Sequence, residues 1–406
     1  MSRCTSEYFI AQASGRHGAA LSQKYIKFAG YDAETDSLGN FVARLQGTLN
    51  VRRGLNDERF LETETNRMEA DRRVWQVLLQ LSNPRAAAGG ANDPCLSAAQ
   101  WQQLFDLARV HGVLGILLHN LGSPCAANHN AWRTAERLWY AKLAKSLLLR
   151  HYGPELVDGL TAAGIPAATF KGADFADHLY PRPALRAMFD IDVLIPRERW
   201  SEAGAALEKL GYARDVVPTM RFAASEYGEE SWRLRSNPAI ECDLHWNLIN
   251  HPSQRRRASI EFADLDWEAA GESGTMASFA TASRATPASR LVIAAAHAAI
   301  THQFDRLLLL CDLREACRHF TSEVELAKLR LLVDRTGMRA AIDVALSVTA
   351  RVLNDPGAAD LRNRLGTRTF TRFGAGLASE GLLLDRQSRA SRVRLRLLRE
   401  LLKRAA

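Results

Sequence analysis

Apolar residues recur every three or four positions over most of the chain, which is the spacing of an amphipathic helix. The pattern covers residues 57–82, 96–122 and 131–164. Ser97 stands where it can cap the second of these helices, and Gly122 stands where it can end it. The first part of the chain is therefore predicted to be helical.

The pattern changes after residue 164 to short runs of β-prone residues. These runs span residues 165–170, 189–195 and 238–249, and a helical stretch at 201–212 lies between the last two. From about residue 284 the spacing is helical again. The centre of the chain is predicted to be a small α/β unit.

The order helix, α/β, helix predicts an α+β protein in which a small mixed-sheet core is flanked by two helical regions. With 406 residues the chain exceeds the roughly 250 at which a single core stops growing. The predicted parts are a poorly defined extension at 1–60, a helical N-terminal region at 61–160, the α/β core at 161–283, and a helical C-terminal region with a basic tail at 284–406.

A net charge of +8 favours anionic ligands such as nucleotides. Much of the surplus lies at 386–404, where arginines and leucines are interleaved at helical spacing. We interpret this tail as a helix packed on its leucine face; RNA or an acidic membrane surface is the alternative ligand. The sequence shows no apolar run of membrane-spanning length and no signal peptide, which predicts a cytoplasmic protein. The six cysteines form no CxxC pair that would indicate a zinc site.

Two aspartates, Asp190 and Asp192, stand inside an apolar run, where an ionised carboxylate is costly unless a cation pairs with it. Side chains two apart on a strand point to the same face. Lys171 and Gly172 lie between the preceding strand and a short helix, where a tight turn and free amides favour a phosphate. Carboxylates beside such a turn predict Mg²⁺, or Mn²⁺, bridging to phosphate oxygens. Asp243, on a later strand, adds the third acid of a two-metal arrangement.

The runs KGADFADHLYPRPALRAMFDIDVL and ECDLHW resemble a family of bacterial nucleotidyltransferases described only as uncharacterised, a branch of the polymerase-β-like nucleotidyltransferase superfamily. The resemblance extends from about residue 75 to about residue 320. Gly172 matches the glycine of the superfamily's turn, Asp190 and Asp192 its acid-x-acid pair, and Asp243 its third acid. The resemblance implies the nucleotidyltransferase fold and metal-dependent chemistry, without indicating an acceptor.

The predicted enzyme moves NMP from an NTP donor, ATP among the candidates, to an acceptor and releases pyrophosphate. The predicted catalytic and metal-binding residues are Asp190, Asp192 and Asp243. The predicted nucleotide-binding residues are Lys171, Gly172 and Arg186. For Arg186 an equal alternative is a salt bridge that holds the aspartates in place, and for Lys171 the alternative is a simple ion pair with a nearby aspartate.

Four further residues are candidates for contact with the base or the acceptor: His245, His297, His302 and Asp312. His245 shares the predicted strand face of Asp243, and a core histidine is nearly as good an interpretation. The last three are spaced by five and ten residues, which does not put three ligands on one helix face. A polar helix packed beside the cleft is therefore favoured over a second metal site.

The sequence agrees with several classes of acceptor. A small molecule such as an aminoglycoside or sugar, or a peptide from a natural-product pathway, is favoured over a protein side chain or nucleic acid. Two other functions fit the aspartates: a non-catalytic nucleotide- or protein-binding module of the same fold, and a glycosyl-transfer enzyme whose DxD holds a metal. The motifs GxSxG, the P-loop and the Rossmann glycine fingerprint are absent, which argues against hydrolase, P-loop and dehydrogenase functions.

Overall fold

The computed structural model describes most of the chain from residue 72 onward. The described residues are 72–90, 93–215, 226–255, 258–269, 283–366, 376–377, 383 and 389–404. The predicted extension at 1–60 and the first half of the helix predicted at 57–82 lie outside the described residues.

A mixed five-stranded sheet with the order β1-β2-β5-β4-β3 lies at the centre of the α/β part. In this sheet β2 and β5 are parallel, and all other neighbouring strands are antiparallel. A separate antiparallel pair joins β6 and β7. The strands are β1 (Ala168–Thr169), β2 (Ile191–Leu194), β3 (Tyr212–Arg214), β4 (Glu229–Leu234), β5 (Asn237–His245), β6 (Trp267–Ala269) and β7 (Ser283–Ala285).

The predicted fold class, helices around a small mixed sheet, is confirmed. The three predicted β-prone runs contain β1, β2 and β5, each shorter than its run or shifted along it. The predicted runs do not include β3, β4, β6 or β7. β4 alternates half-buried or exposed polar residues with buried ones along EESWRL, and one of the buried residues, Glu230, is itself charged, so the apolar alternation that marks a strand is weak.

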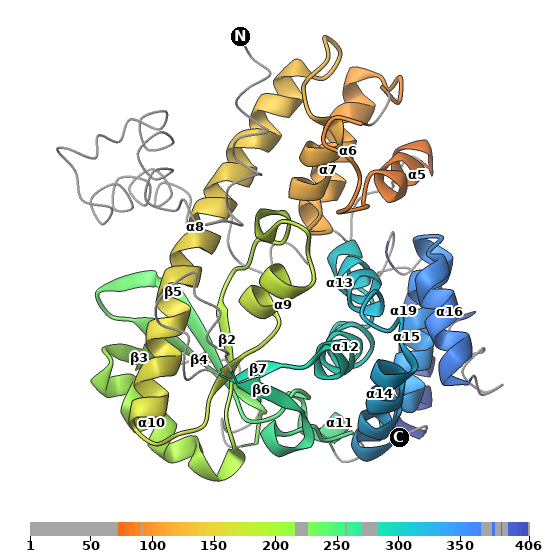
Figure 1. The fold of residues 1–406 in the computed structure, drawn as a ribbon. Coiled ribbons are helices and arrows are strands. Elements are labelled where there is room, and N and C mark those ends of the chain that lie inside the picture. The colour runs from red at the N-terminus through yellow and green to blue at the C-terminus, as the bar shows by residue number, and fades with distance from the viewer. Residues whose placement is uncertain are drawn as a thin grey trace.

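Helices cover the sheet and extend the molecule on both sides (Figure 1). Before the sheet come α5 (Arg72–Gln80), α6 (Ala98–Val110), α7 (Leu114–Leu121) and α8 (His129–Ala162). Within the α/β part come α9 (Gly172–His178), η1 (Pro183–Leu185), η2 (Arg197–Arg199), α10 (Trp200–Lys209), α11 (Pro252–Arg255) and η3 (Phe262–Asp264). After it come α12 (Pro287–Ala295), the π-helical η4 (Ala296–Thr301), α13 (Leu307–Cys317), α14 (Glu323–Thr336), α15 (Arg339–Val352), α16 (Pro356–Leu365) and α19 (Arg389–Arg404). No helix among the described residues is long and apolar enough to cross a membrane.

Local signals explain where several helices begin and end. The hydroxyl of Ser97 accepts a hydrogen bond from the backbone N–H of Gln100 and starts α6 with a capping box. Gly122, with φ 75°, ends α7. The single helix predicted at 96–122 is two helices, because Gly112 at φ 74° breaks the run.

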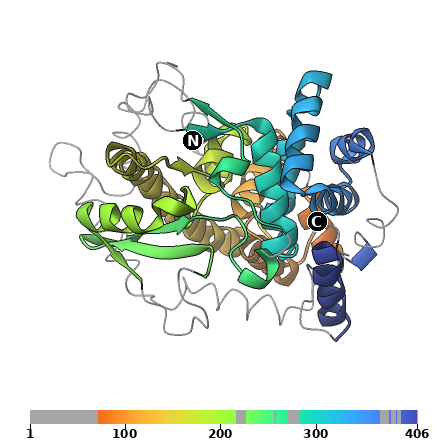
Figure 2. The same cartoon turned by 90° about the horizontal axis from the view of Figure 1, so that it is seen from below.

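Two hydrophobic cores hold the molecule together, and α8 takes part in both. Its first half, including Trp132 and Trp139, packs in a large core shared with α5–α7 and with α12–α16. Its second half, from Leu149 to Leu160, packs against Ile191 and other apolar residues of the sheet. Figure 2 shows α12 and the helices after it on the other side of the molecule from α10 and the strands β3 and β4. The domain boundaries at residues 160 and 283 stay a prediction.

Two buried ion pairs join the α/β part to the C-terminal helices. Arg290 of α12 donates from Nε and Nη2 to the two carboxylate oxygens of Asp174 on α9, at 2.9 and 2.8 Å. Arg186, next to η1, donates in the same way to Asp312 of α13, at 3.0 and 2.9 Å. Because both members of each pair are buried, removal of one member leaves a charge without compensation.

Replacement of Asp174 by alanine is expected to lower the free energy of unfolding by about 3–5 kcal/mol, because Arg290 then stays buried without its partner. Urea denaturation of the full chain measures the change. The matched control is Glu202→Ala, which breaks the solvent-exposed Arg199–Glu202 pair and is expected to leave the free energy of unfolding nearly unchanged. A loss in Asp174→Ala no larger than in the control would contradict the structural role of the pair.

Candidate metal and nucleotide site

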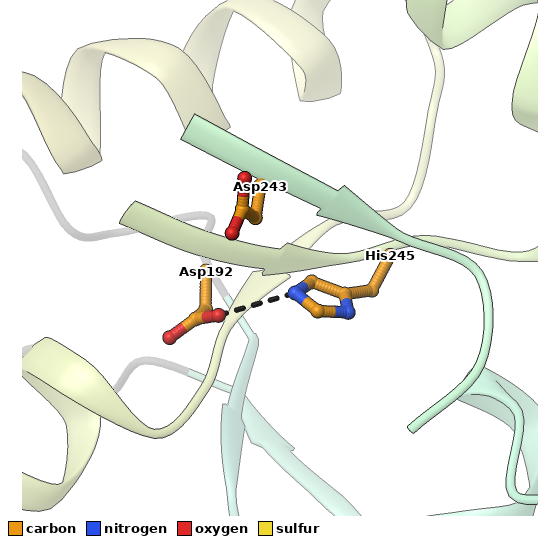
Figure 3. Close-up of side chains that lie close together, drawn as sticks. All are labelled: Asp192, Asp243 and His245. Carbon is orange, nitrogen blue, oxygen red and sulfur yellow. Dashed lines mark hydrogen bonds and ion pairs between the residues drawn. The ribbon is translucent and has the colours of Figure 1, made fainter. Parts of the chain in front are cut away.

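Two carboxylates and an imidazole converge on one face of the sheet. The parallel register of β2 and β5 puts Asp192 directly beside Asp243, and His245 follows Asp243 by two residues on the same face. One potential ligand atom from each of the three side chains lies within 4.8 Å of the others. Figure 3 shows both carboxylates and the imidazole projecting from the two neighbouring strands into the same space.

His245 is held by contacts on several sides of its ring. Its Nε2 lies 3.1 Å from Oδ1 of Asp192, drawn as the dashed line in Figure 3. Its Nδ1 lies 3.4 Å from Oε2 of Glu229, without hydrogen-bond geometry. The ring packs edge-on against Phe170, with centroids 4.9 Å apart. An imidazole fixed in this way orients the Asp192 carboxylate.

The Lys171 ammonium also pairs with Asp192, with Nζ 2.7 Å from Oδ1. Burial opposes the charge of Lys171, but the negative charges of Asp192, Glu229 and Asp190 prevail and raise its pKa. The backbone of Lys171 has φ 55° and ψ −114°, a strained conformation for a residue other than glycine. The turn between β1 and α9 therefore holds the Lys171 ammonium beside Asp192. Lys171 thus supplies a cation to one of the two aspartates that the sequence places in an apolar run.

The carboxylates of the site differ in their protonation. Burial would raise the pKa of Asp192, but the charge of Lys171 and the hydrogen bond to His245 lower it below its usual range. Asp243 has the opposite shift: burial, and then the charges of Glu229, Asp190 and Asp192, raise its pKa well above the usual value. Asp243 is thus the carboxylate best suited to accept a proton.

The donor set fits a divalent cation. Four carboxylates, those of Asp190, Asp192, Asp243 and Glu229, act on one another in this cluster, whereas Lys171 is the lysine that pairs with it. Carboxylate oxygens suit Mg²⁺ and Mn²⁺. The residues present therefore fit the predicted metal, with oxygens from Asp192 and Asp243 nearest to one another and His245 available beside them.

Asp190 stands one residue before β2 and outside the three side chains whose ligand atoms converge. Its charge nevertheless acts on the site, because it raises the pKa of both Lys171 and Asp243. Its backbone carbonyl lies near Gly172, 3.7 Å from where a Cβ of that glycine would stand. Asp190 is therefore placed between the carboxylate cluster and the turn.

Gly172 is the first residue of α9, and the positive φ of the turn belongs to Lys171. A Cβ on Gly172 would lie 3.3 Å from Cε and 3.5 Å from Cβ of Met188. The glycine thus allows the segment before β2 to approach the start of α9 closely. The sequence predicted that Gly172 would form the tight turn. In the structure Gly172 instead allows close packing, and Lys171 adopts the positive φ.

Arg186 and Asp312 bind each other. Besides its two hydrogen bonds to Asp312, Arg186 directs Nη1 at the carbonyl oxygen of Gly172, at 3.5 Å. The hydroxyl of Tyr180 donates to Oδ1 of Asp312 at 2.7 Å. The side chains of Arg186 and Asp312 are only 7% and 2% exposed. Of the two interpretations of Arg186, this arrangement agrees with a salt bridge, although its partner is Asp312 rather than a site aspartate.

His297 and His302 lie against each other, with ring centroids 4.5 Å apart. His302 also pairs with Asp305, with Nδ1 3.1 Å from Oδ2. Burial, and then the charges of His302, Lys171, Arg186 and Arg306, lower the pKa of His297 well below its usual value. His297 is therefore neutral and lies within electrostatic range of the turn.

Two residues near the site escaped the sequence analysis. Glu229 opposes His245 in the antiparallel register of β4 and β5, and the alternation along EESWRL was the signal that could have revealed it. Lys142, in the middle of α8, lies with Nζ 3.8 Å from the ring centroid of Phe189. Nothing in the sequence distinguishes it from the other basic residues of that helix.

A sequence profile of the family of uncharacterised nucleotidyltransferases matches residues 97–354. The chain belongs to this family. The matched segment contains the turn at Lys171, the strands β2 and β5 and all of the predicted site residues. The family resemblance stated from the sequence is thereby confirmed.

Solved structures of ANT(2″)-Ia are among those similar to this chain. One is a crystal structure of ANT(2″)-Ia in complex with adenylyl-2″-tobramycin, with 19% identity over 46% of this chain and 93% of that chain and a TM-score of 0.30. The other is a solution structure of the antibiotic-resistance factor ANT(2″)-Ia, with 18% identity over 44% of this chain and 88% of that chain and a TM-score of 0.29. No curated protein matches the chain.

A divalent cation is expected to stabilise the folded protein, because it offsets the repulsion among the carboxylates. At a Mg²⁺ or Mn²⁺ concentration of 100 times its Kd, the free energy of unfolding should rise by about 2.7 kcal/mol. Urea denaturation with and without the ion measures this change. The rise should be largely lost in Asp243→Asn and kept in Glu268→Gln, which removes an exposed charge on β6.

The variant Asp243→Asn is also expected to change how the stability of the metal-free protein depends on pH. The pKa of Asp243 is raised on folding, so the native state binds a proton there that the unfolded chain releases, and stability falls as the pH rises through the folded pKa. Asp243→Asn removes this loss and should be at least as stable as the parent at pH 8. A metal-free variant that is clearly less stable at pH 8 would contradict the charge-crowding account.

Proposed function

We propose that the protein is a metal-dependent nucleotidyltransferase that moves NMP from an NTP to an acceptor hydroxyl or other nucleophile and releases pyrophosphate. The observation that carries the proposal is the position of Asp192 and Asp243, side by side on the parallel strands β2 and β5 next to the Lys171–Gly172 turn. Membership in the nucleotidyltransferase family supports it.

The donor is assigned to the side of the sheet where β1 ends and β2 begins. There the Lys171 ammonium and the backbone at the start of α9 face the end of β2 that bears Asp190. An ammonium binds phosphate as a point charge. Lys171 and Gly172 are therefore proposed to hold the triphosphate, and Arg186 to keep the turn in place through Asp312 and the Gly172 carbonyl.

Asp190, Asp192 and Asp243 are proposed to hold the divalent cation, Mg²⁺ or Mn²⁺. The bound cation would neutralise charge on the phosphate oxygens and lower the pKa of the attacking group. His245 keeps the Asp192 carboxylate oriented through the bond to Oδ1. This orientation leaves the second oxygen of Asp192 free of the His245 and Lys171 contacts, both of which involve Oδ1.

The chemical step is a substitution at the α-phosphorus. The acceptor oxygen forms a bond to the α-phosphorus, the bond from that phosphorus to the bridging oxygen of the β-phosphate breaks, and pyrophosphate leaves with the electron pair. The acceptor loses a proton, for which Asp243 is the proposed base. Its position beside Asp192 at the metal site supports this role.

The acceptor is proposed to be a small molecule or a peptide. His297, which lies within electrostatic range of Lys171, and His302, whose ring contacts that of His297, are proposed to line its path to the site. The neutral imidazole of His297 can donate to and accept from an acceptor's hydroxyl or amide groups.

Incubation of the full chain with each of the four NTPs, Mg²⁺ or Mn²⁺, and a panel of aminoglycosides, sugars and peptides should add the mass of one NMP to an acceptor, as seen by mass spectrometry. Asp192→Asn and Asp243→Asn are each expected to lower kcat/KM by about 100-fold or more, because each removes a metal-binding group or the base.

The matched control is Asp215→Asn, which removes a carboxylate paired with Arg233 at the far edge of the sheet and should leave the rate within twofold. Transfer of a sugar from a UDP-sugar, with no use of NTP, would instead establish the glycosyl-transfer function. Nucleotide binding without turnover of any NTP would favour the non-catalytic module.

A further inference from the structure

Lys142 is a lysine that the proposed mechanism does not use. It lies on α8, outside the sheet and the turn, and its Nζ stands 3.8 Å from the ring centroid of Phe189, the residue before Asp190. No carboxylate in the described part of the chain forms an ion pair with it. One turn further along the same helix, Lys145 does have such a partner, Glu241, at 3.4 Å.

The surroundings of Lys142 are cationic. Burial, and then the charges of Arg306 and Arg186, lower the pKa of Lys142 from its ordinary value to about 7. Arg186 and Arg306 are themselves paired, with Asp312 and with Asp305. Lys142 is thus a half-buried amine with positive neighbours, and this is a costly environment unless an anion binds there.

The position of Lys142 indicates which anion it would take. The segment that carries Arg186 and Phe189 packs on the start of α9: Arg186 points Nη1 at the carbonyl of Gly172 at 3.5 Å, and Met188 fills the space beside that glycine. The backbone N–H of Met188 donates to Oγ of Ser146 on α8, at 3.1 Å. α8 therefore presents Lys142 to the same end of the sheet at which the turn is proposed to hold the donor.

We propose that Lys142 forms a pyrophosphate subsite beside the turn, which binds the β- and γ-phosphates of the NTP and the pyrophosphate that leaves. This inference rests on the proposed nucleotidyl transfer for its role, but not for the binding of pyrophosphate itself. When the bond to the α-phosphorus breaks, negative charge accumulates on the β-phosphate. An ammonium placed there stabilises the leaving group most in the transition state.

Titration calorimetry of the full chain with inorganic pyrophosphate, with no NTP present, tests the subsite directly. The variant Lys142→Met is expected to bind pyrophosphate about 10-fold more weakly or worse, since it loses a charge-assisted contact. Lys145→Met, the matched control on the same helix, should stay within twofold of the parent. Lys142→Arg keeps the charge and should retain most of the affinity.

Thermal unfolding separates a binding role from a structural one. Because Lys142→Met removes a charge that has no carboxylate partner among the described residues, its unfolding temperature should equal or exceed that of the parent. A variant that binds weakly while folded as stably as the parent supports the subsite. Equal pyrophosphate affinity in the parent and Lys142→Met, or no binding by the parent, would overturn it.

The two proposals fail in distinguishable ways. A parent protein that uses no NTP but binds pyrophosphate through Lys142 would contradict the nucleotidyl transfer and keep the subsite. A parent protein that transfers NMP, with the same KM for NTP and the same pyrophosphate affinity in Lys142→Met, would keep the transfer and exclude the subsite. Where both hold, Lys142→Met raises the KM for NTP and leaves the KM for the acceptor unchanged.

Discussion

Repulsion among carboxylates on two parallel strands is the constraint on which the rest of the site depends. The register that sets Asp192 beside Asp243 brings two negative charges together on a half-buried surface, and Glu229 and Asp190 add two more. Such a cluster is unfavourable by itself. It stays folded because an ammonium and an imidazole bind one of its members, and because the sheet that carries it packs on a continuous apolar core.

The groups that offset this negative charge or hold the site in place come from elements far apart in the sequence. Lys171 comes from the end of β1, His245 from β5, and the buried pairs of Asp174 and Asp312 come from α9 and α13. The pairs fix the turn and the segment before β2 to the C-terminal helices. The buried ion pairs thereby fix the position of the negatively charged carboxylate cluster. Metal-assisted phosphate chemistry requires groups held in a fixed geometry.

Local structure was largely readable from local signals. The cap at Ser97, the stop at Gly122 and the spacing of apolar residues predicted helices in the right parts of the chain. The long runs were predicted as single helices because periodicity carries no mark for a break such as Gly112 or for the π-turn that follows α12. β4 was missed because polar residues stand on both of its faces, so its sequence lacks the apolar alternation of a strand.

The sequence by itself determined the fold class, the family and the acid pair Asp190 and Asp192 that indicates a cation. Each follows from a local signal: the spacing of apolar residues, short motifs, and two acids two positions apart. Only the tertiary structure decided that Lys171 and His245 share Asp192, that Glu229 joins them, that Arg186 is bound by Asp312, and that Lys142 stands without a carboxylate among the described residues. Those contacts join residues 16 to 126 positions apart in the chain, and their charges interact through a low-dielectric interior whose shape no local pattern encodes.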